Sequence, residues 1–399
     1  MSIVFIIAFI FGLIMNMYID YNQEIYEKEG SFVTGYDFSK IINKLKKNED
    51  KYSWICDYSS KAIQDAILTE EKAFKSFFKR HKGYPHFKSR KRLNKESFFF
   101  VKNNIHYINK NVIQIPIIGK IRITESNYLP DISSITSGRV IKEYNKYYIM
   151  LIYDSNYDYI SLTNNKLGID VGIKYYVTIS DNTSSYHINH FKDLDKYRSY
   201  NDKIIKYQEI ISKKQLINYN RLLNRYYDKH GEEPTEKVKN IMKGESYNSS
   251  NIRRLQFKIH MIRNKQRNIR NDYINKLVYF LTARTKPSVI TIENLDISEM
   301  INHNGTKDAT LHKYINESSF YTFKVKLTDK CKYFGIKLRE ADKYFASSKI
   351  CSCCGNKIKS LTLNDRVYYC NNCGLTIDRD INASLNLLNL KDKKCKIIA

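Results

Sequence analysis

Three observations predict a multi-domain protein of the α/β class. Strand-like segments rich in Ile, Val and Tyr alternate with long segments of helical period. The 399 residues, 42 % of them hydrophobic, are enough for two or three packed cores. Several of the eight cysteines stand in paired C-x-x-C spacing, which favours a metal site in a reducing compartment over a disulfide framework. We therefore expect a cytoplasmic protein.

The charge of the chain indicates a polyanionic partner. Lys and Arg number 67 against 41 Asp and Glu, so the formal net charge is +26. Abundant Ile, Lys, Asn and Tyr are also typical of an AT-rich genome. Codon bias alone would not gather the basic residues into clusters, however, and here they are clustered.

The first expected elements are helices. Residues 3–15 form an uncharged apolar run of 13 residues. This run is short for a membrane span of about 20 residues and lacks the basic start of a secretory signal. We interpret it as a buried helix, with an interfacial or vestigial segment as the alternative. Residues 61–80 carry apolar side chains at helical spacing, which predicts an amphipathic helix.

A basic and aromatic segment follows, with the sequence GYPHFKSRKR over residues 83–92. Basic residues mixed with aromatic ones suit a phosphate backbone and stacked bases, although a solvated basic loop has the same composition. The candidate nucleic-acid contacts here are Lys88, Arg90, Lys91 and Arg92.

Between residues 97 and 159 the hydrophobic period changes to that of strands. Short runs such as SFFFV and KYYIMLIY are separated by Asn, Gly and Pro turns. Several short antiparallel strands in succession predict a small β-barrel.

Residues 167–181, LGIDVGIKYYVTISD, are the stretch around which the chain is organised. They predict two largely buried strands, and Asp170 stands among the apolar residues of the first. An ionised carboxylate that is buried without a partner is costly, so it protonates, pairs or binds a metal. Asp170 is therefore either salt-bridged or a ligand.

Two further acids occupy similar positions. Glu293 stands at the end of the apolar strand-like segment 288–295, and Asp380 opens the short apolar helix expected over 378–388. Alone, Glu293 could pair with a lysine and Asp380 could cap a helix. Three acids at the ends of separate apolar elements instead favour a Mg²⁺ site, because Mg²⁺ takes a few carboxylates together with water and substrate phosphate.

The polar segment 193–281 has a helical period and a basic face. Residues 251–270 carry seven Lys or Arg and no Asp or Glu, while an apolar stripe runs along the other side. A solvated charged helix normally mixes signs, so this face favours contact with a nucleic-acid backbone. The candidate contacts are Arg253, Arg254, Lys258, Arg263, Lys265, Arg267 and Arg270.

Two C-x-x-C-G knuckles predict a structural zinc site with four cysteine ligands. We take Cys351, Cys354, Cys370 and Cys373 as the ligands. Cys353 competes with Cys354, but choosing Cys354 lets each knuckle end in Gly, which tolerates the positive φ of such turns. A zinc ribbon alone would also fit a transcription protein.

Taken together, I-D-V-G-I-K, I-E-N-L and the paired knuckles followed by D-R-D-I-N-A-S-L-N resemble the TnpB family. These transposon-encoded, RNA-guided DNA nucleases are similar to compact type V CRISPR effectors. The match spans roughly residues 55–390, and GYPHFKS also resembles a motif of the family. The resemblance implies an RNase H-like (RuvC-like) nuclease core with a helical insertion and a four-cysteine zinc ribbon, preceded by a helical and β-barrel recognition lobe.

The resemblance also implies roles for the acids. Asp170, Glu293 and Asp380 match the catalytic residues, which would hold two Mg²⁺ ions for hydrolysis of the phosphodiester. The motif D-x-D-x-N-A assigns the ligand to Asp380, leaving Asp378 to cap or orient. One structural Zn²⁺ would complete the cofactors.

The implied organisation has five parts. The family usually opens with a basic strand, and none is visible here, so the start resembles a truncated or re-started copy. The parts are a helical recognition segment (1–96), a β-barrel segment (97–164), a nuclease core with an insertion at about 190–285 (165–345), the zinc ribbon (346–376) and the final acid, helix and tail (377–399).

The implied function is RNA-guided, Mg²⁺-dependent cleavage of double-stranded target DNA, with a guide RNA as partner and an association with transposition and DNA recombination. We expect no small-molecule substrate, no membrane contact, and a place at the nucleoid if the cell is prokaryotic. One alternative is a guide-independent RuvC-like nuclease or resolvase, which would not need the extra lobe. Another is a cleavage-deficient RNA-guided DNA binder, which would not need the three acids.

Overall fold

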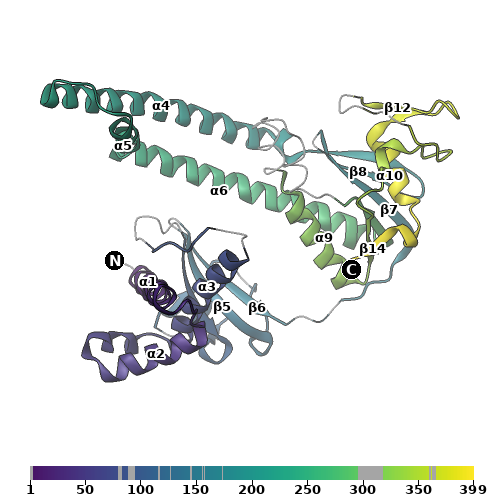
Figure 1. Cartoon of the computed structure of the whole chain (residues 1–399). Helices are drawn as coiled ribbons and strands as arrows, with labels where there is room; N and C mark the ends of the chain where they lie inside the picture. Colours follow the sequence, from purple (N-terminus) through teal and green to yellow (C-terminus); the bar gives the residue numbers. More distant parts are fainter. Residues whose placement is uncertain are drawn as a thin grey trace. The chain divides into compact units, whose positions relative to one another are not determined.

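The computed structural model divides the chain into two compact units, Met1–Asn156 and Tyr157–Ala399 (Figure 1). Each unit has its own hydrophobic core. The structure describes residues 3–79, 83–88, 95–115, 117–125, 127–143, 146–154, 156, 158–172, 174–294, 318–358, 361 and 365–399.

The first unit begins with helices packed around an aromatic core. Buried residues of α1 include Phe11, Ile14 and Tyr18, and Tyr18 contacts Phe38 of α2 and Phe74 of α3. The N-terminal run is helical, and of its described side chains Phe11 and Ile14 are buried while Leu13 is exposed. Within the described part of the chain, no helix combines the length and apolarity that a membrane span needs. The helices are α1 (Ile3–Glu29), α2 (Gly35–Asn48), the 3₁₀ segment η1 (Asp50–Asp57) and α3 (Ser60–Phe78).

The strands of the first unit form two separate antiparallel sheets of three strands. The expected β-barrel is therefore not confirmed, because the described strands do not close into one. Alternating hydrophobicity predicts strands well, but closure depends on the pairing of the first and last strands, which the pattern does not specify. The sheets have the orders β1-β5-β6 and β2-β3-β4, with β1 (Lys95–Val101), β2 (His106–Asn109), β3 (Val112–Ile115), β4 (Gly119–Arg122), β5 (Ile135–Glu143) and β6 (Lys146–Tyr153).

The second unit is built on a six-stranded mixed sheet of order β14-β11-β10-β7-β8-β9. The strands β7, β8 and β9 form an antiparallel meander, and β10 runs parallel to both β7 and β11. A parallel neighbour requires a long crossover, which the helical segment between β9 and β10 provides. The bounds are β7 (Thr163–Val171), β8 (Tyr175–Ser180), β9 (Ser185–Asn189), β10 (Pro287–Ile292), β11 (Lys337–Ala341) and β14 (Cys395–Ile397).

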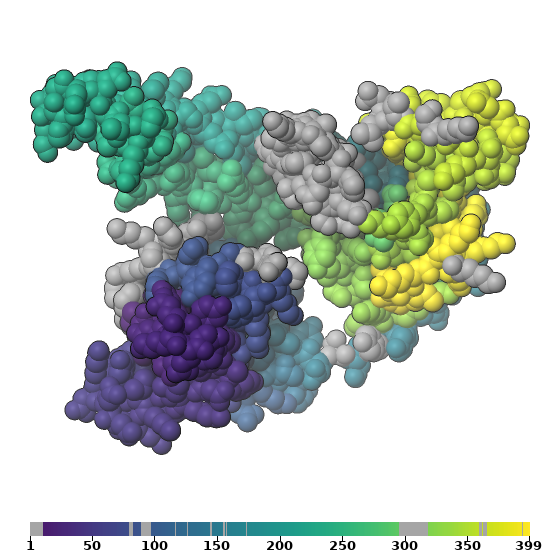
Figure 2. Space-filling model, in the orientation of Figure 1, coloured from purple at the N-terminus to yellow at the C-terminus, as the bar shows by residue number. Residues whose placement is uncertain are grey.

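The crossover forms a long helical arm, as the period of residues 193–281 predicts. Ile204 and Ile211 of α4 pack against Ile252 and Ile259 of α6, at spacings of seven residues in each helix. In Figure 2 the outer part of this arm, in teal, projects away from the yellow C-terminal part of the same unit. Its helices are α4 (Asp195–His230), α5 (Glu236–Ser246) and α6 (Ser250–Tyr279), and a π-helical turn, Phe280–Arg284, follows α6.

Helices cover both faces of the sheet. The end of α6 and α9 (Phe320–Phe334) pack on the face that carries Leu167 and Ile169. Because side chains alternate along a strand, Gly168 and Asp170 point to the opposite face. That face carries α10 (Arg379–Leu388), whose Ser384 Oγ lies 2.6 Å from Ser180 Oγ of β8.

Gly168 allows α10 to approach the sheet at backbone distance. A Cβ atom at this position would lie 2.1 Å from the carbonyl oxygen of Ser384 and 2.4 Å from the amide nitrogen of Leu388. Both obstructing atoms belong to the backbone, so a larger residue would have to push the helix away.

The remaining elements are the hairpin β12 (Val367–Tyr369) and β13 (Thr376–Asp378), between β11 and α10.

We predict that Gly168→Ala displaces α10 and destabilises the second unit by about 1–3 kcal/mol, the usual cost of overpacking. Thermal unfolding of the purified variant measures this loss. The matched control is Gly244→Ala in α5, where an added Cβ has no neighbour within 4 Å; it should be neutral or stabilising by about 0.5–1 kcal/mol. Equal melting temperatures for Gly168→Ala and the wild type would contradict the close approach.

Candidate acidic site and cysteine cluster

Two of the predicted acids come together at one edge of the sheet. Asp170 is the penultimate residue of β7, and Glu293 directly follows β10. Ile292 pairs with Ile169 in the parallel register, which sets Glu293 beside Asp170. Their carboxyl groups are hydrogen-bonded to each other.

The electrostatics of this pair favour a shared proton. Burial raises the pKa of Asp170 well above its usual value, and the charges of Glu293 and Asp380 raise it further, while Arg379 lowers it. Burial also raises the pKa of Glu293, opposed by hydrogen bonds from Asp170 and Ser347. The Ser347 Oγ donates to Glu293 Oε1 over 3.3 Å. Crowded carboxylates of this kind suit a hard divalent cation, which would take the place of the proton.

The third acid reaches this edge on the first turn of α10. The charge of Asp380 raises the pKa of Asp170, whereas Asp378 caps the helix. Asp378 Oδ1 accepts hydrogen bonds from the backbone N–H of Asp380 (2.8 Å) and of Ile381 (3.2 Å). Asp378 is therefore the N-cap of the helix, and Asp380 remains available to a ligand at the sheet edge.

The remaining polar residues of the DRDINASLN motif hold α10 in place, a role that sequence reasoning missed. Asn382 Nδ2 donates to the carbonyl of Ile350 (2.7 Å), and its Oδ1 accepts from the N–H of Ser352 (2.9 Å). Asn386 Nδ2 donates to the carbonyls of Ser347 (2.8 Å) and Ile350 (2.6 Å). The available signal was two asparagines four residues apart in a helix, where asparagine is a poor helix former.

The four expected cysteines form one cluster. The sulfur atoms of Cys351, Cys354, Cys370 and Cys373 all lie within 4.8 Å of one another, whereas Cys353 is exposed and outside the group. The Cys351–Cys373 and Cys354–Cys370 sulfurs are 3.6 and 3.5 Å apart. In a tetrahedral Zn²⁺ site with bonds of about 2.3 Å the sulfurs would be about 3.8 Å apart, so the cluster fits this ion.

The backbone around the cluster explains its shape. Gly355 and Gly374, which end the two knuckles, have φ values of 75° and 72°, as the C-x-x-C-G pattern predicts. Their N–H groups donate to the carbonyls of Cys351 (3.0 Å) and Cys370 (2.9 Å). Each knuckle is therefore closed by its own hydrogen bond before any ion is considered.

Hydrogen bonds to the sulfur of Cys354 favour its thiolate form. The amide of Asn372 donates to Cys354 Sγ over 3.5 Å. This bond, followed by one from the backbone of Asn356, lowers the pKa of Cys354 to about 6. A thiolate at neutral pH is the form that binds a metal.

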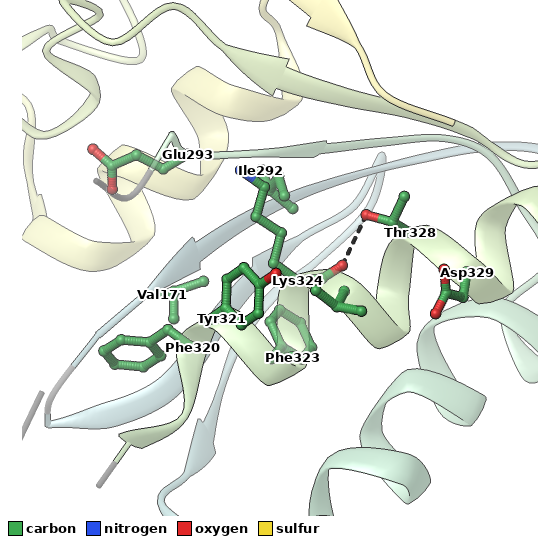
Figure 3. A pocket seen from close by; sticks show the side chains of 10 residues that line it. Val171, Ile292, Glu293, Phe320, Tyr321, Phe323, Lys324, Thr328 and Asp329 are labelled. Carbon is green, nitrogen blue, oxygen red and sulfur yellow. Dashed lines mark hydrogen bonds between the residues drawn. The ribbon is translucent and has the colours of Figure 1, made fainter. Parts of the chain in front are cut away.

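A groove of about 270 Å³ runs from Glu293 along α9 (Figure 3). Glu293 lies at one end and Asp329 at the other, with the side chain of Lys324 between them. Its walls are mainly apolar, and Tyr321 is 70 % exposed. The acidic edge therefore continues into a surface hollow on the α9 face.

The predicted nucleic-acid contacts have different surroundings. Lys88 Nζ lies 2.9 Å from Glu70, which is buried in α3, and the Lys88 backbone exchanges two hydrogen bonds with Asn16. Lys88 thus anchors its segment to α1 and α3, and its contact with phosphate stays a prediction. Arg90, Lys91 and Arg92 lie outside the described residues.

On α6, the predicted basic residues except the half-buried Arg270 are exposed. The ammonium groups of Lys258 and Lys265 lie 5.7 Å from the ring centroids of Tyr207 and Tyr200 of α4. The two pairs are spaced seven residues apart in both helices. The basic face of the arm is therefore lined with tyrosine rings from the neighbouring helix.

Comparison with known proteins agrees with these features. Residues 320–387, from α9 through the cysteine cluster to α10, match the family model for the Cas12f1-like TNB domain. Proteins of Streptomyces pristinaespiralis and Escherichia coli (strain K12), both named "Putative RNA-guided DNA endonuclease", are each 24 % identical to this chain. The matches cover 88 % and 86 % of this chain and 76 % and 77 % of those proteins. Together these matches support a TnpB-type protein.

A solved structure shares the fold of this TnpB-type chain. The Cas12f1 protein, determined by cryo-electron microscopy in a complex with sgRNA and target DNA, matches with a TM-score of 0.54 at 17 % identity. The match covers 98 % of this chain and 82 % of that one. At this identity the likeness concerns the fold, and it spans both units.

We predict that Cys354→Ser removes the bound metal and lowers the yield of folded protein, because a closed four-cysteine site contributes directly to folding. Elemental analysis should find about one zinc per wild-type chain and less than about a tenth of that in the variant. Cys353→Ser is the matched control and should keep full zinc content. The opposite result in this pair would move the site to Cys353.

Proposed function

We propose that this TnpB-type protein is an RNA-guided, Mg²⁺-dependent DNA endonuclease with a RuvC-like core. The observation that carries the proposal is the meeting of carboxylates from β7, β10 and α10 at one sheet edge, where burial and the neighbouring acids raise the pKa of Asp170. Crowded carboxylates of this kind take up either a proton or a cation. The names of the two relatives support the assignment of the reaction.

Each of the three acids offers oxygen atoms to a bound metal ion. Asp170 and Glu293 offer oxygens fixed by the sheet, and Asp380 adds a third from the helix. Two bound Mg²⁺ ions would neutralise phosphate charge and activate water. Asp378 holds the first turn of α10, and Ser347 orients Glu293. The chain supplies no covalent nucleophile in this scheme.

We assign one structural Zn²⁺ to the cysteine cluster. Its role is to fix the segment 347–352, which carries Cys351 and is bonded to both asparagines of α10. The ribbon thereby sets the position of the helix that bears Asp380. This role needs no contact between zinc and the substrate.

We also propose a guide RNA and double-stranded target DNA as partners, and an association with a transposon. Support comes from the net charge of +26 and from the exposed basic face of α6. The separate first unit favours this function over a guide-independent nuclease, which has no need of a second lobe. The retained acids favour it over a binder without cleavage.

We predict that Asp170→Asn lowers DNA cleavage by about 100- to 1,000-fold, since metal ions contribute several kcal/mol of charge stabilisation. Binding of DNA, measured by gel shift, should stay near the wild-type level. The control is Asp272→Asn, which removes an exposed acid that pairs with Lys276 on the surface of α6 and should cut normally. Undiminished cleavage by Asp170→Asn, or by the wild type in excess EDTA, would remove the acids from the mechanism.

We further predict that protein expressed with its native flanking DNA co-purifies with one discrete RNA transcribed from beside its gene. Cleavage should follow the variable end of that RNA when the end is reprogrammed. Replacing Arg253, Arg254 and Lys258 by Gln should lower the retained RNA several-fold, since each lost phosphate contact weakens binding. The same charge change at Lys237, Lys239 and Lys243 of α5 is the control. Heterogeneous RNA, with cleavage indifferent to its sequence, would leave the guide-independent nuclease.

A further inference from the structure

A row of side chains crosses the sheet beside the acidic edge. In the registers of β7, β8 and β9, Asp170 pairs with Thr178, and Thr178 pairs with His187. The next row on the same face contains Gly168, Ser180 and Ser185, over which Ser384 of α10 lies. His187 therefore stands on the face that α10 covers, one row closer to the start of that helix.

The imidazole of His187 is held from two sides. Its Nδ1 is hydrogen-bonded to the hydroxyl of the buried Thr178 over 2.9 Å. The ring also stacks on Tyr175, with centroids 4.0 Å apart and planes 15° from parallel. When Thr178 donates its proton, Nε2 carries the imidazole N–H. That N–H then has a fixed direction.

This direction leads to the cap of α10. His187 Nε2 lies 3.8 Å from Asp378 Oδ1, the same oxygen that accepts the N–H groups of Asp380 and Ile381. The distance is too long for a hydrogen bond, but it places the positive end of the ring dipole against the carboxylate. Thr178 of the sheet thus contacts His187, His187 lies against Asp378, and Asp378 caps the first turn of the helix.

We propose that His187 is a positioning residue that fixes the first turn of α10, and with it Asp380, over the end of β7; this inference rests on the proposed function. The bond between Ser384 and Ser180 anchors the helix one turn beyond Asp380. Tilting about that anchor would move Asp380 relative to Asp170 while leaving the helix packed. The contact between His187 and Asp378 opposes that tilt at the end where the metal oxygen is needed.

The test variant is His187→Ala. It is compared with His187→Gln, whose amide N–H can still face Asp378. The control is His106→Ala, which removes an exposed histidine of β2. The first readout needs neither metal nor nucleic acid. Amide hydrogen exchange in a peptide covering residues 376–388 should be faster in His187→Ala and near the wild-type rate in the Gln and His106 variants. Unchanged exchange in His187→Ala would overturn the proposal.

The second readout is the Mg²⁺ concentration needed for half-maximal cleavage. It should rise about 10-fold in His187→Ala, as for other groups that orient a metal ligand, with DNA binding unchanged and with recovery at high Mg²⁺. The Gln variant should recover most of the loss. An unchanged Mg²⁺ requirement would also overturn the proposal. If His187→Ala does not fold, Thr178→Val, which frees the ring without removing it, gives the same comparison.

The two readouts separate the two proposals. If the wild type cuts no DNA under any guide, the proposed function fails, and the exchange experiment still decides whether His187 fixes α10. If the wild type cuts and both readouts of His187→Ala match it, only the positioning role fails.

Discussion

The close approach of α10 to β7 at Gly168 is the constraint on which the acidic site depends. Two residues along the strand separate Gly168 from Asp170 on one face, a distance of about 6.6 Å. One turn of helix, about 5.4 Å, separates Ser384 from Asp380. Because the backbone of Ser384 touches Gly168, these similar steps bring Asp380 toward Asp170. A side chain at position 168 would hold the helix and its acid away from the sheet.

The site that results is electrostatically unfavourable without a cation, and the fold holds it together by other means. Asp170 and Glu293 are forced side by side by the parallel pairing of β7 and β10, which is itself buried in the apolar core. The energy that holds two carboxyl groups together therefore comes from packing elsewhere in the sheet. Burial raises the pKa of both carboxyl groups and the charge of Glu293 raises that of Asp170 further, and a cation bound between them would relieve this repulsion.

Several parts of this arrangement could be predicted from the sequence because they are local. The cysteine cluster follows from knuckle spacing, and the helical arm follows from a sustained period. The cap by Asp378 follows from its place before an apolar helix. The three acids stand out as charges at the ends of apolar elements, and the resemblance added their expected roles, whereas the roles of Gly168 and Asn382 depend on contacts between segments distant in sequence. Strand closure and the ion pair of Lys88 with the buried Glu70 are also tertiary features, which the sequence pattern does not indicate.

The cysteine cluster and the acidic site both contact α10. This helix links the two sites, although they share no ligand residue. Residues two apart on a helix point about 200° away from each other, so Ser384 faces the sheet while Asn382 and Asn386 face the ribbon. The segment that accepts their amides also carries Ser347, whose hydroxyl donates to Glu293. The segment next to the cysteine cluster therefore contacts two of the three acids. It contacts Glu293 through the hydroxyl of Ser347, and it fixes Asp380 through its hydrogen bonds to α10. A change in the cluster would therefore alter the orientation of the Glu293 carboxylate and the position of Asp380 at once, while Asp170 stays fixed within the sheet.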